Sequence, residues 1–131
     1  MIIMAINFNK DSVIDLTPIS RSEVYSEIEA LLLEDEKICA AFKTIRDQLV
    51  FTTLRIISAD VQGITGKRVS YTSLPYSKIQ FFTIQTPGFA ELVPDSELAL
   101  VFTNGFKATF EFKGKTNIGG LGRLISRYVL K

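Results

Sequence analysis

The sequence contains no histidine and only one cysteine, Cys39, among its 131 residues. Without an imidazole, Ser-His-Asp and Cys-His catalytic arrangements are excluded, and so is the commonest transition-metal ligand. A single thiol cannot form an intramolecular disulfide or complete a structural zinc site, and it fits a reducing compartment. We therefore predict no catalytic residue, no metal and no cofactor, and we interpret Cys39 as a small buried residue of a strand.

The sequence also lacks an excess of charge of either sign. Fifteen basic residues face fourteen acidic ones, for a net charge of +1. Such a balance gives no field to steer a nucleic acid, so we expect no nucleic-acid partner. Neighbouring carboxylates occur at 34–36 and at Asp95 and Glu97. We interpret both groups as solvated turns rather than as catalytic pairs of the glycosidase type.

No apolar run is long enough to cross a membrane as a helix, which takes about 20 residues. The N-terminal MIIMAINF is short and is followed by asparagine, lysine and aspartate, without the flanks of a signal peptide. We therefore expect a cytoplasmic protein. Residues 1–12 are interpreted as an N-terminal arm that could pair with a neighbour's sheet edge. Residues 13–131 are predicted to form a single domain.

The first predicted element is a helix from Pro18 to Leu33. Pro18 suits a first helical turn, and Ser20 and Glu23 stand at the spacing of a capping box. Val24 and Ile28 begin an apolar stripe at helical intervals. The pattern predicts a helix that packs one face on a sheet.

From Glu36 the apolar period changes to two, which predicts strands. The long run 49–62 is expected to divide near Thr52–Thr53, and Pro75 marks a corner between two strands. Asn104-Gly105 is a strong hairpin signal. Asn117 is expected to cap a final amphipathic helix that reaches Leu130, and the glycines of NIGGLG (117–122) indicate close packing.

The order is therefore a helix, about seven antiparallel strands and a C-terminal helix. Without βαβ units a parallel sheet is disfavoured, and consecutive strands on short turns favour two roughly orthogonal sheets or a partly open barrel. The C-terminal helix is suited to cap an open end of such a barrel. The predicted class is mostly β, with an extra N-terminal helix.

This pattern resembles the bacterial pleckstrin-homology-like family. The resemblance is carried by IRDQLVFTTLRIISADVQGITGKRVSYTSLPYSKIQFFTIQTPGF (45–89), DSELAL (95–100) and IGGLGRLISRYVL (118–130), and it covers residues 18–131. It implies a small cytoplasmic barrel module without known catalytic residues, whose members assemble into ring-shaped homo-oligomers. MIIMAINFNKD and the glycines of GGLG depart from the family pattern.

Apolar residues occupy both faces of two predicted strands, and the mean hydropathy is +0.23. We expect Ile79 and Phe81 to fill the core, which leaves Phe82 and Ile84 on the opposite side. Because a small barrel buries one face of each strand, the other must meet a helix or another subunit. The predicted oligomer interface comprises Phe82, Ile84, Val50 and Ile57. The expected function is a non-catalytic module that self-associates and docks a protein or peptide.

The alternative is a membrane-surface module that binds anionic lipid headgroups. The candidate contacts are Arg46, Lys67, Arg68 and Lys78. Pleckstrin-homology domains that bind such headgroups cluster basic residues around the loop after the first strand. Here that loop, KTIRDQ (43–48), also carries Asp47, and the other bases are spread over separate strands. Solvated strand faces are therefore the competing interpretation.

Overall fold

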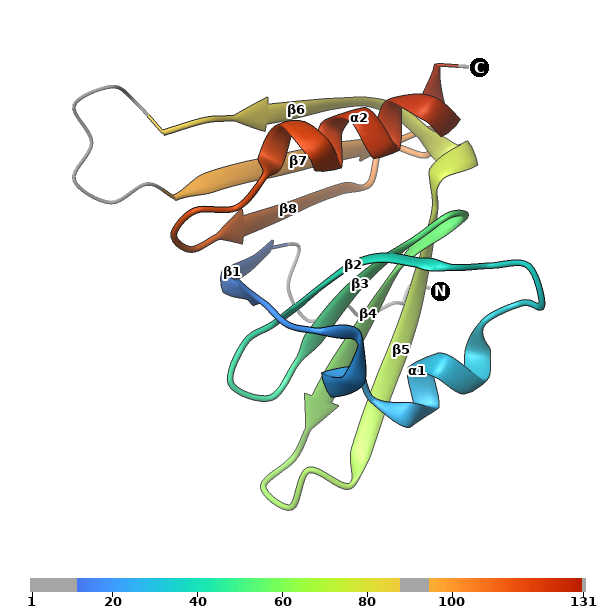
Figure 1. The fold of residues 1–131 in the computed structure, drawn as a ribbon, viewed down its shortest axis with the longest axis vertical. Helices are drawn as coiled ribbons and strands as arrows, with labels where there is room; N and C mark the ends of the chain where they lie inside the picture. Colours follow the sequence, from blue (N-terminus) through green and yellow to red (C-terminus); the bar gives the residue numbers. More distant parts are fainter. Residues whose placement is uncertain (1–11, 88–94, 131) are drawn as a thin grey trace. The chain divides into compact units, whose positions relative to one another are not determined.

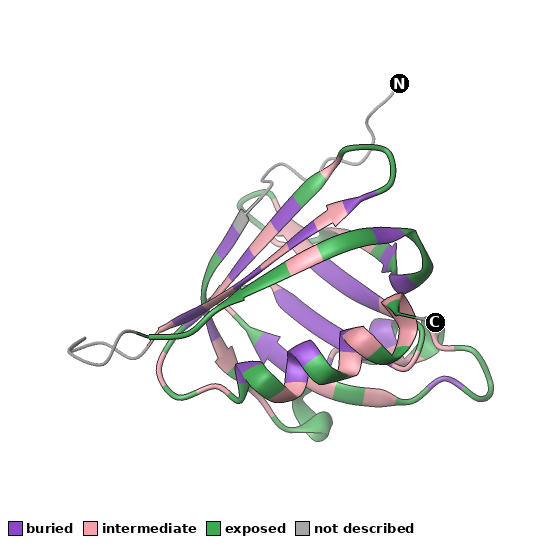
Figure 2. Cartoon of the chain, turned by 90° about the horizontal axis from the view of Figure 1, so that it is seen from above, coloured by how far each residue is buried: buried purple, intermediate pink, exposed green. Residues whose placement is uncertain are grey.

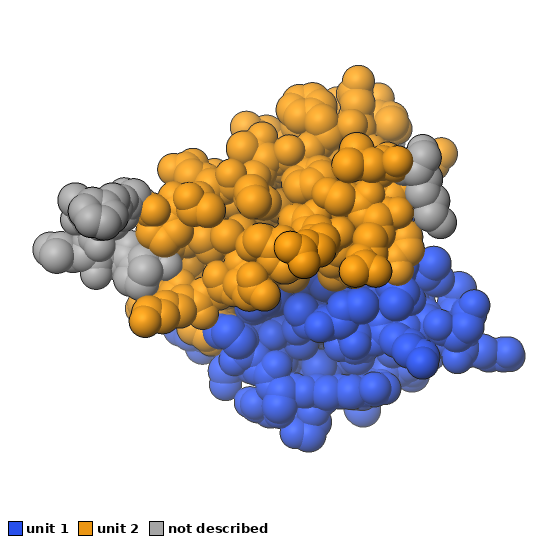
Figure 3. Space-filling view, turned by 45° about the horizontal axis from the view of Figure 1, so that its top comes forward, with its two compact units in different colours: residues 1–9, 18–75 blue, residues 10–17, 76–131 orange. Residues whose placement is uncertain are grey.

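The computed structural model describes residues 12–87 and 95–130, which divide into two compact units (Figures 1 and 3). The described part of unit 1 is 18–75, and that of unit 2 is 12–17, 76–87 and 95–130. Apart from Ser12, the predicted N-terminal arm lies outside the described residues. The same holds for most of the predicted loop from Pro87 to Asp95.

Unit 1 is an antiparallel sheet in the order β2-β3-β4-β5, preceded by two short helical segments. Consecutive strands pair through short turns, as the alternating sequence predicts. Its elements are η1 (Arg21–Glu23), α1 (Ser26–Leu31), β2 (Ile38–Lys43), β3 (Gln48–Thr52), β4 (Arg55–Gln62) and β5 (Arg68–Pro75).

The predicted helix from Pro18 to Leu33 is wrong in extent. The capping box of Ser20 and Glu23 is present, but it closes only the 3-10 turn η1, and α1 has six residues. The interruption comes from Gln48, whose side-chain amide donates to the Glu23 carbonyl and accepts from the Tyr25 N–H, both at 2.9 Å. A continuous helix would use these two backbone groups itself, so a tertiary contact overrides the local helical pattern.

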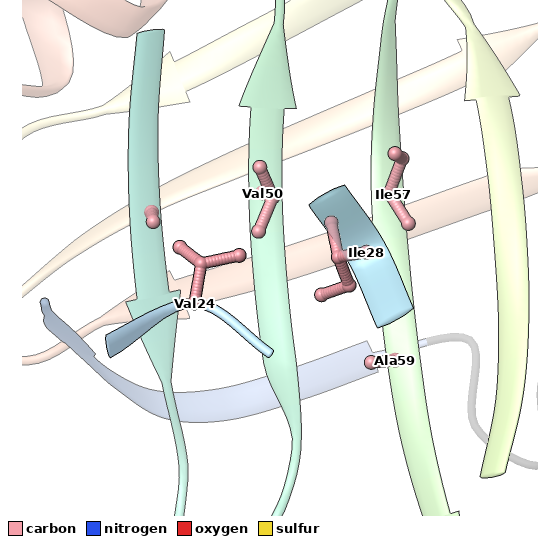
Figure 4. Close-up of a cluster of buried hydrophobic side chains, with 6 residues drawn as sticks. Val24, Ile28, Val50, Ile57 and Ala59 are labelled. Carbon is pink, nitrogen blue, oxygen red and sulfur yellow. The ribbon is translucent and has the colours of Figure 1, made fainter. Parts of the chain in front are cut away.

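The segment that precedes β2, residues 18–37, is called the N-terminal segment of unit 1. Two of its side chains, Val24 and Ile28, lie over the sheet of unit 1 (Figure 4). Beneath them are Val50 and Ile57, which are fully buried. The strand β3 is buried along its whole length, so its residues are covered on both faces. The first core cluster of unit 1 comprises Val24, Ile28, Ala41, Val50, Ile57 and Ala59.

Cys39 lies in a strand, as predicted, but it is exposed rather than buried. The register of β2 against β3 shifts between Ile38 and Ala40, so the simple alternation of faces is broken there. Ile38 and Ala41 consequently both pack in the first core cluster, although they are an odd number of positions apart. The thiol points away from that cluster, toward the Lys37 carbonyl at 3.8 Å.

Unit 2 is a four-stranded sheet in the order β1-β8-β7-β6. Three strands are antiparallel, whereas β1 runs parallel to β8 and was not predicted. Asp15 of β1 has a φ of 61°, and the register shifts around it, between Val13 and Leu16. The elements are β1 (Ser12–Pro18), η2 (Tyr76–Lys78), β6 (Ile79–Gln85), β7 (Ser96–Phe102), β8 (Lys107–Phe112) and α2 (Ile118–Val129).

The hairpin at Asn104-Gly105 and the C-terminal helix are confirmed. Gly105 has a φ of +89°, and the Phe102 N–H donates to the Phe106 carbonyl at 2.8 Å. The Asn117 side chain accepts from the Gly120 N–H and so caps α2. Figure 2 shows buried residues recurring along α2 between exposed ones, as an amphipathic helix requires.

The strand β6 contains a bulge that reverses the predicted faces. Ile79 pairs with Phe102 and Phe81 with Val101, so one extra residue is inserted between them. Ile79 is buried as predicted, but Phe81 is 54% exposed. The expectation that Phe81 fills the core is therefore wrong.

Helix α2 packs closely on β6 through a glycine. A Cβ built at Gly122 would lie 3.5 Å from the Ile84 side chain and 3.8 Å from that of Phe82, so both side chains lie against the helix. Tyr76 and Tyr128 stack with ring centroids 5.2 Å apart and join η2 to the same helix. The predicted close packing at the glycines is confirmed for Gly122.

A buried ion pair joins separate parts of unit 1. The Arg55 guanidinium donates to both carboxylate oxygens of Glu36 at 2.9 Å and to the Leu31 carbonyl at 2.7 Å. The same carboxylate accepts from the Thr52 hydroxyl at 2.6 Å and from the Leu33 N–H at 3.0 Å. Burial alone would raise the pKa of Glu36. These hydrogen bonds and the Arg55 charge outweigh burial and lower it to about 2.

Replacing Arg55 by alanine should lower the free energy of unfolding near pH 7 by about 3 kcal/mol, because Glu36 would stay buried without its cation. The pKa of Glu36 is about 2 in the folded chain and 4.5 in its ordinary state. The stabilisation is therefore complete above pH 4.5 and is lost as the pH falls toward 2. Urea unfolding across this range should show that the difference in the free energy of unfolding between wild type and R55A becomes smaller as the pH falls. K43A is the control, since its solvent-exposed pair with Glu23 should contribute little to stability. An equal loss in both variants would contradict this.

Replacing Gly122 by alanine should raise the free energy of unfolding by about 0.5–1 kcal/mol, because alanine favours the helix and its Cβ would meet Ile84 at ordinary contact distance. G122L should be destabilising, since the longer side chain has no space there. G120A is the control. Its Cβ would lie 2.6 Å from the Asn117 side chain and would displace the cap, so it should gain less than G122A. Thermal unfolding measures the stabilities of the three variants. A G120A variant that is more stable than G122A would refute the prediction.

Candidate functional site

The groups with shifted pKa values are all explained by structural contacts. Burial, followed by the charge of Glu27, raises the pKa of Tyr71. Hydrogen bonds from Ser20 lower the pKa of the exposed Glu23, and Glu36 belongs to the buried ion pair. Across residues 12–87 and 95–130, no three or more Cys, Asp or Glu side chains gather where they could hold a metal ion.

Exposed apolar side chains are numerous for a chain of this size. Large residues of this kind are found at hairpin tips, at the end of α1, on β6 and at the end of α2. A single exposed apolar residue is ordinary, but grouped ones mark interaction surfaces. The exposed large hydrophobic residues are Ile14, Leu31, Leu33, Ile45, Leu54, Ile64, Phe81, Ile84 and Leu130.

Two of them, Ile45 and Ile64, are fully exposed at hairpin tips on the same end of the unit 1 sheet. The β2–β3 turn and the β4–β5 turn are held side by side there. Arg46 donates from Nη2 to the carbonyls of Val61 at 3.0 Å and Gly63 at 2.7 Å. We name this end the hairpin tips, defined by residues 44–47 and 63–68. Sequence reasoning missed both isoleucines. Ile45 stands inside the predicted loop 43–48, and Ile64 stands in the glycine-flanked stretch 63–66, where an apolar residue is unusual.

The structure brings three of the four predicted basic contacts to the hairpin tips. Lys67 and Arg68 are exposed at the start of β5, and Arg46 lies in the adjacent turn. The hydrogen bonds of Arg46 go to carbonyl groups, so its positive charge is not neutralised by them. Lys78 is exposed at the end of η2 in unit 2.

The strand β6 forms an open edge of the unit 2 sheet. In the described part of the chain it pairs with β7 alone, and five of its seven residues are exposed. Phe81 and Thr83 lie opposite Val101 and Ala99 of β7. The face that these side chains share is therefore partly apolar and open to solvent. We name it the β6 face.

The four predicted interface residues fall in different environments. Val50 and Ile57 are fully buried beneath Val24 and Ile28. The sequence predicted that a helix or another subunit would cover this face, and here the residues before β2 cover it. Phe82 and Ile84 lie against Gly122 of α2, with Ile84 still 36% exposed. Phe81, which was expected in the core, is the exposed aromatic residue of this strand.

A mostly β chain with hairpin-connected sheets and a capped C-terminal helix is the architecture of pleckstrin-homology domains, so the predicted fold class is confirmed. It has eight described strands rather than seven. The family model of the bacterial PH domain matches residues 7–129, and the chain belongs to this family.

Two relatives from Bacillus subtilis (strain 168) bear the names uncharacterized protein YjqA and uncharacterized protein YozO. YjqA is 46% identical over 82 residues, which cover 63% of this chain and 64% of YjqA, less than two thirds of its length. YozO is 33% identical over 111 residues, covering 85% of this chain and 94% of YozO. Neither name states an activity.

Solved structures give the same fold. A DUF1696 family protein with a pleckstrin-homology domain from Shewanella loihica PV-4 is 31% identical, with a TM-score of 0.74 over 89% of this chain and 99% of that one. A pleckstrin homology domain from Shewanella amazonensis SB2B is 37% identical, with a TM-score of 0.60 over 81% and 85%. A PH domain containing protein from Exiguobacterium sibiricum 255-15, 21% identical with a TM-score of 0.62, covers 88% and 61% and agrees in fold. Within the described ranges, neither α1 nor α2 has the length and apolar character needed to span a membrane.

Proposed function

We propose that this protein is a non-catalytic binding and assembly module of the cytoplasm, which self-associates into a homo-oligomer through β6 and then docks a protein or peptide partner. The observation that carries the proposal is the unprotected edge of β6. Proteins usually blunt such an edge with charged residues or proline. The strand IQFFTIQ has neither.

The exposed side chains of β6 support the same interface. A strand added at this edge would continue the unit 2 sheet and would bring its own side chains beside Phe81 and Thr83. Phe81 is 54% exposed and would lose contact with water in such a pairing. In unit 1, the edge strand β5 is half-buried along its middle and ends at Pro75, so β6 is the more exposed edge strand.

Size-exclusion chromatography with light scattering tests this proposal. The wild-type chain of 14.6 kDa should elute at a multiple of its monomer mass. The double variant F81E/T83E should elute as a monomer, because it places like charges on the β6 face of neighbouring copies. I45E is the matched control, since it adds a charge at an exposed hairpin tip and should leave the mass unchanged. A monomeric wild type at micromolar concentration would refute the proposal, and so would an unchanged mass of F81E/T83E.

A second candidate function is contact with an anionic membrane surface through the hairpin tips. Two fully exposed isoleucines stand beside Arg46, Lys67 and Arg68. Apolar tips that enter the headgroup region and cations that meet acidic lipids act together in such binding. Asp47 and Asp60 lie in the same region and offset part of the charge, which is why this function stands second.

Sedimentation with vesicles of phosphatidylserine and phosphatidylcholine tests the second candidate. Binding should fall as salt is raised, and it should be lost in I45S/I64S and weakened in K67E/R68E. K78E is the control with the same type of charge reversal in unit 2, and it should bind like wild type. Vesicle binding that is absent, or that falls equally in K78E and K67E/R68E, would overturn this function.

A further inference from the structure

Three exposed leucines lie around the buried ion pair of unit 1. Leu31 ends α1 and is 44% exposed, Leu33 follows it at 59%, and Leu54 in the β3–β4 turn is 43% exposed. We name these three residues the leucine corner. Leucines of this exposure are ordinary when scattered, whereas a group indicates an interaction surface.

Hydrogen bonds hold all three leucine backbones to one cluster. The Leu31 carbonyl accepts from Arg55 at 2.7 Å, and the Leu33 N–H donates to Glu36 at 3.0 Å. The Leu54 N–H donates to the Thr52 hydroxyl at 3.1 Å, and that hydroxyl donates to Glu36. The ion pair therefore keeps two chain segments, distant in sequence, beside each other, and with them the three leucines.

The exposure of Leu31 and Leu33 follows from the backbone between them. Leu32 ends the helix with an extended conformation, φ −70° and ψ 142°, and its side chain packs on the first core cluster of unit 1. Successive side chains of an extended segment point to opposite sides. Leu31 and Leu33 therefore both point away from the core that Leu32 joins.

The surroundings of the leucine corner are acidic. Glu34 and Asp35 directly follow Leu33 and are exposed, and the whole stretch from Ser26 to Glu36 contains five acidic residues and no basic one. Arg55 neutralises Glu36, and Arg21 pairs with Glu29 at 3.5 Å. Glu34 and Asp35 are the exposed acids beside the leucines, and Lys37 is the nearest base along the chain.

We propose that the leucine corner is a docking site for a basic amphipathic segment of another protein. Leucine anchors would receive the apolar face of the segment, and Glu34 and Asp35 would attract its lysine or arginine residues. The ion pair of Glu36 and Arg55 holds the site in its binding geometry before the partner arrives, which lowers the ordering cost of association. The site lies in unit 1 and is separate from β6, so it does not depend on the proposed self-association.

The probe is a synthetic amphipathic helical peptide made of leucine and lysine, with the leucines at helical spacing. Two comparison peptides use the same leucines with glutamate in place of lysine, or the same composition with alternating order. Fluorescence anisotropy measures affinity for the full chain. The amide NMR shifts of Leu33, Glu34 and Leu54 report where the peptide lies.

The leucine–lysine peptide should bind and should shift these amides. L33S/L54S should weaken binding at least about tenfold, as expected when anchors are lost. E34K/D35K, which changes only exposed residues, should weaken it as well. I64S removes another fully exposed aliphatic side chain of unit 1 and should bind like wild type, and circular dichroism checks that each variant is folded.

Equal binding by L33S/L54S and wild type would overturn the proposal, and so would equal binding of the leucine–glutamate peptide. An oligomer mass that falls in L33S/L54S would also overturn it, because a second copy of the chain would then occupy the corner. The proposed self-association is tested separately, by the oligomer mass of F81E/T83E. A folded, monomeric F81E/T83E that still binds the peptide would leave the docking site intact.

Discussion

The ion pair between Glu36 and Arg55 is the interaction on which the arrangement of unit 1 depends. A carboxylate buried to this degree needs partners for both oxygens, and Arg55, Thr52 and the Leu33 N–H supply them. The partners come from β3, β4 and the segment after α1. Because that segment is held in place, Val24 and Ile28 stay over Val50 and Ile57, and the leucine corner stays at the surface.

The excess of apolar residues in this chain has two different explanations. Part of it is internal, because β3, an inner strand of the unit 1 sheet, contains no exposed residue and is covered on both faces. Most of the exposed large apolar residues lie in three places, namely the β6 face, the hairpin tips and the leucine corner. Each is accompanied by a different chemistry: an open backbone edge, basic residues or acidic residues. The proposed binding functions rest on these three surfaces.

Local chemistry was sufficient to predict much of the fold. Asn104-Gly105 and the cap at Asn117 act through their own backbone geometry, and both lie where the sequence indicated. The errors arose where a distant contact decided the outcome. Gln48 interrupts the N-terminal helix from 23 to 25 residues away, and the extra residue in β6 appears only in its pairing with β7. Because of that bulge, Phe81 is exposed, whereas Phe82 lies against α2. The predicted outward face of β6 was therefore assigned to the wrong side chains.

Amide hydrogen exchange of β6 measured at low and at high protein concentration tests the central claim most directly. An edge strand that pairs with a neighbour gains partners for its free N–H groups. The account predicts that exchange within Ile79–Gln85 slows as the concentration rises, while exchange in β5 stays unchanged. Equal exchange rates of β6 at both concentrations would contradict it.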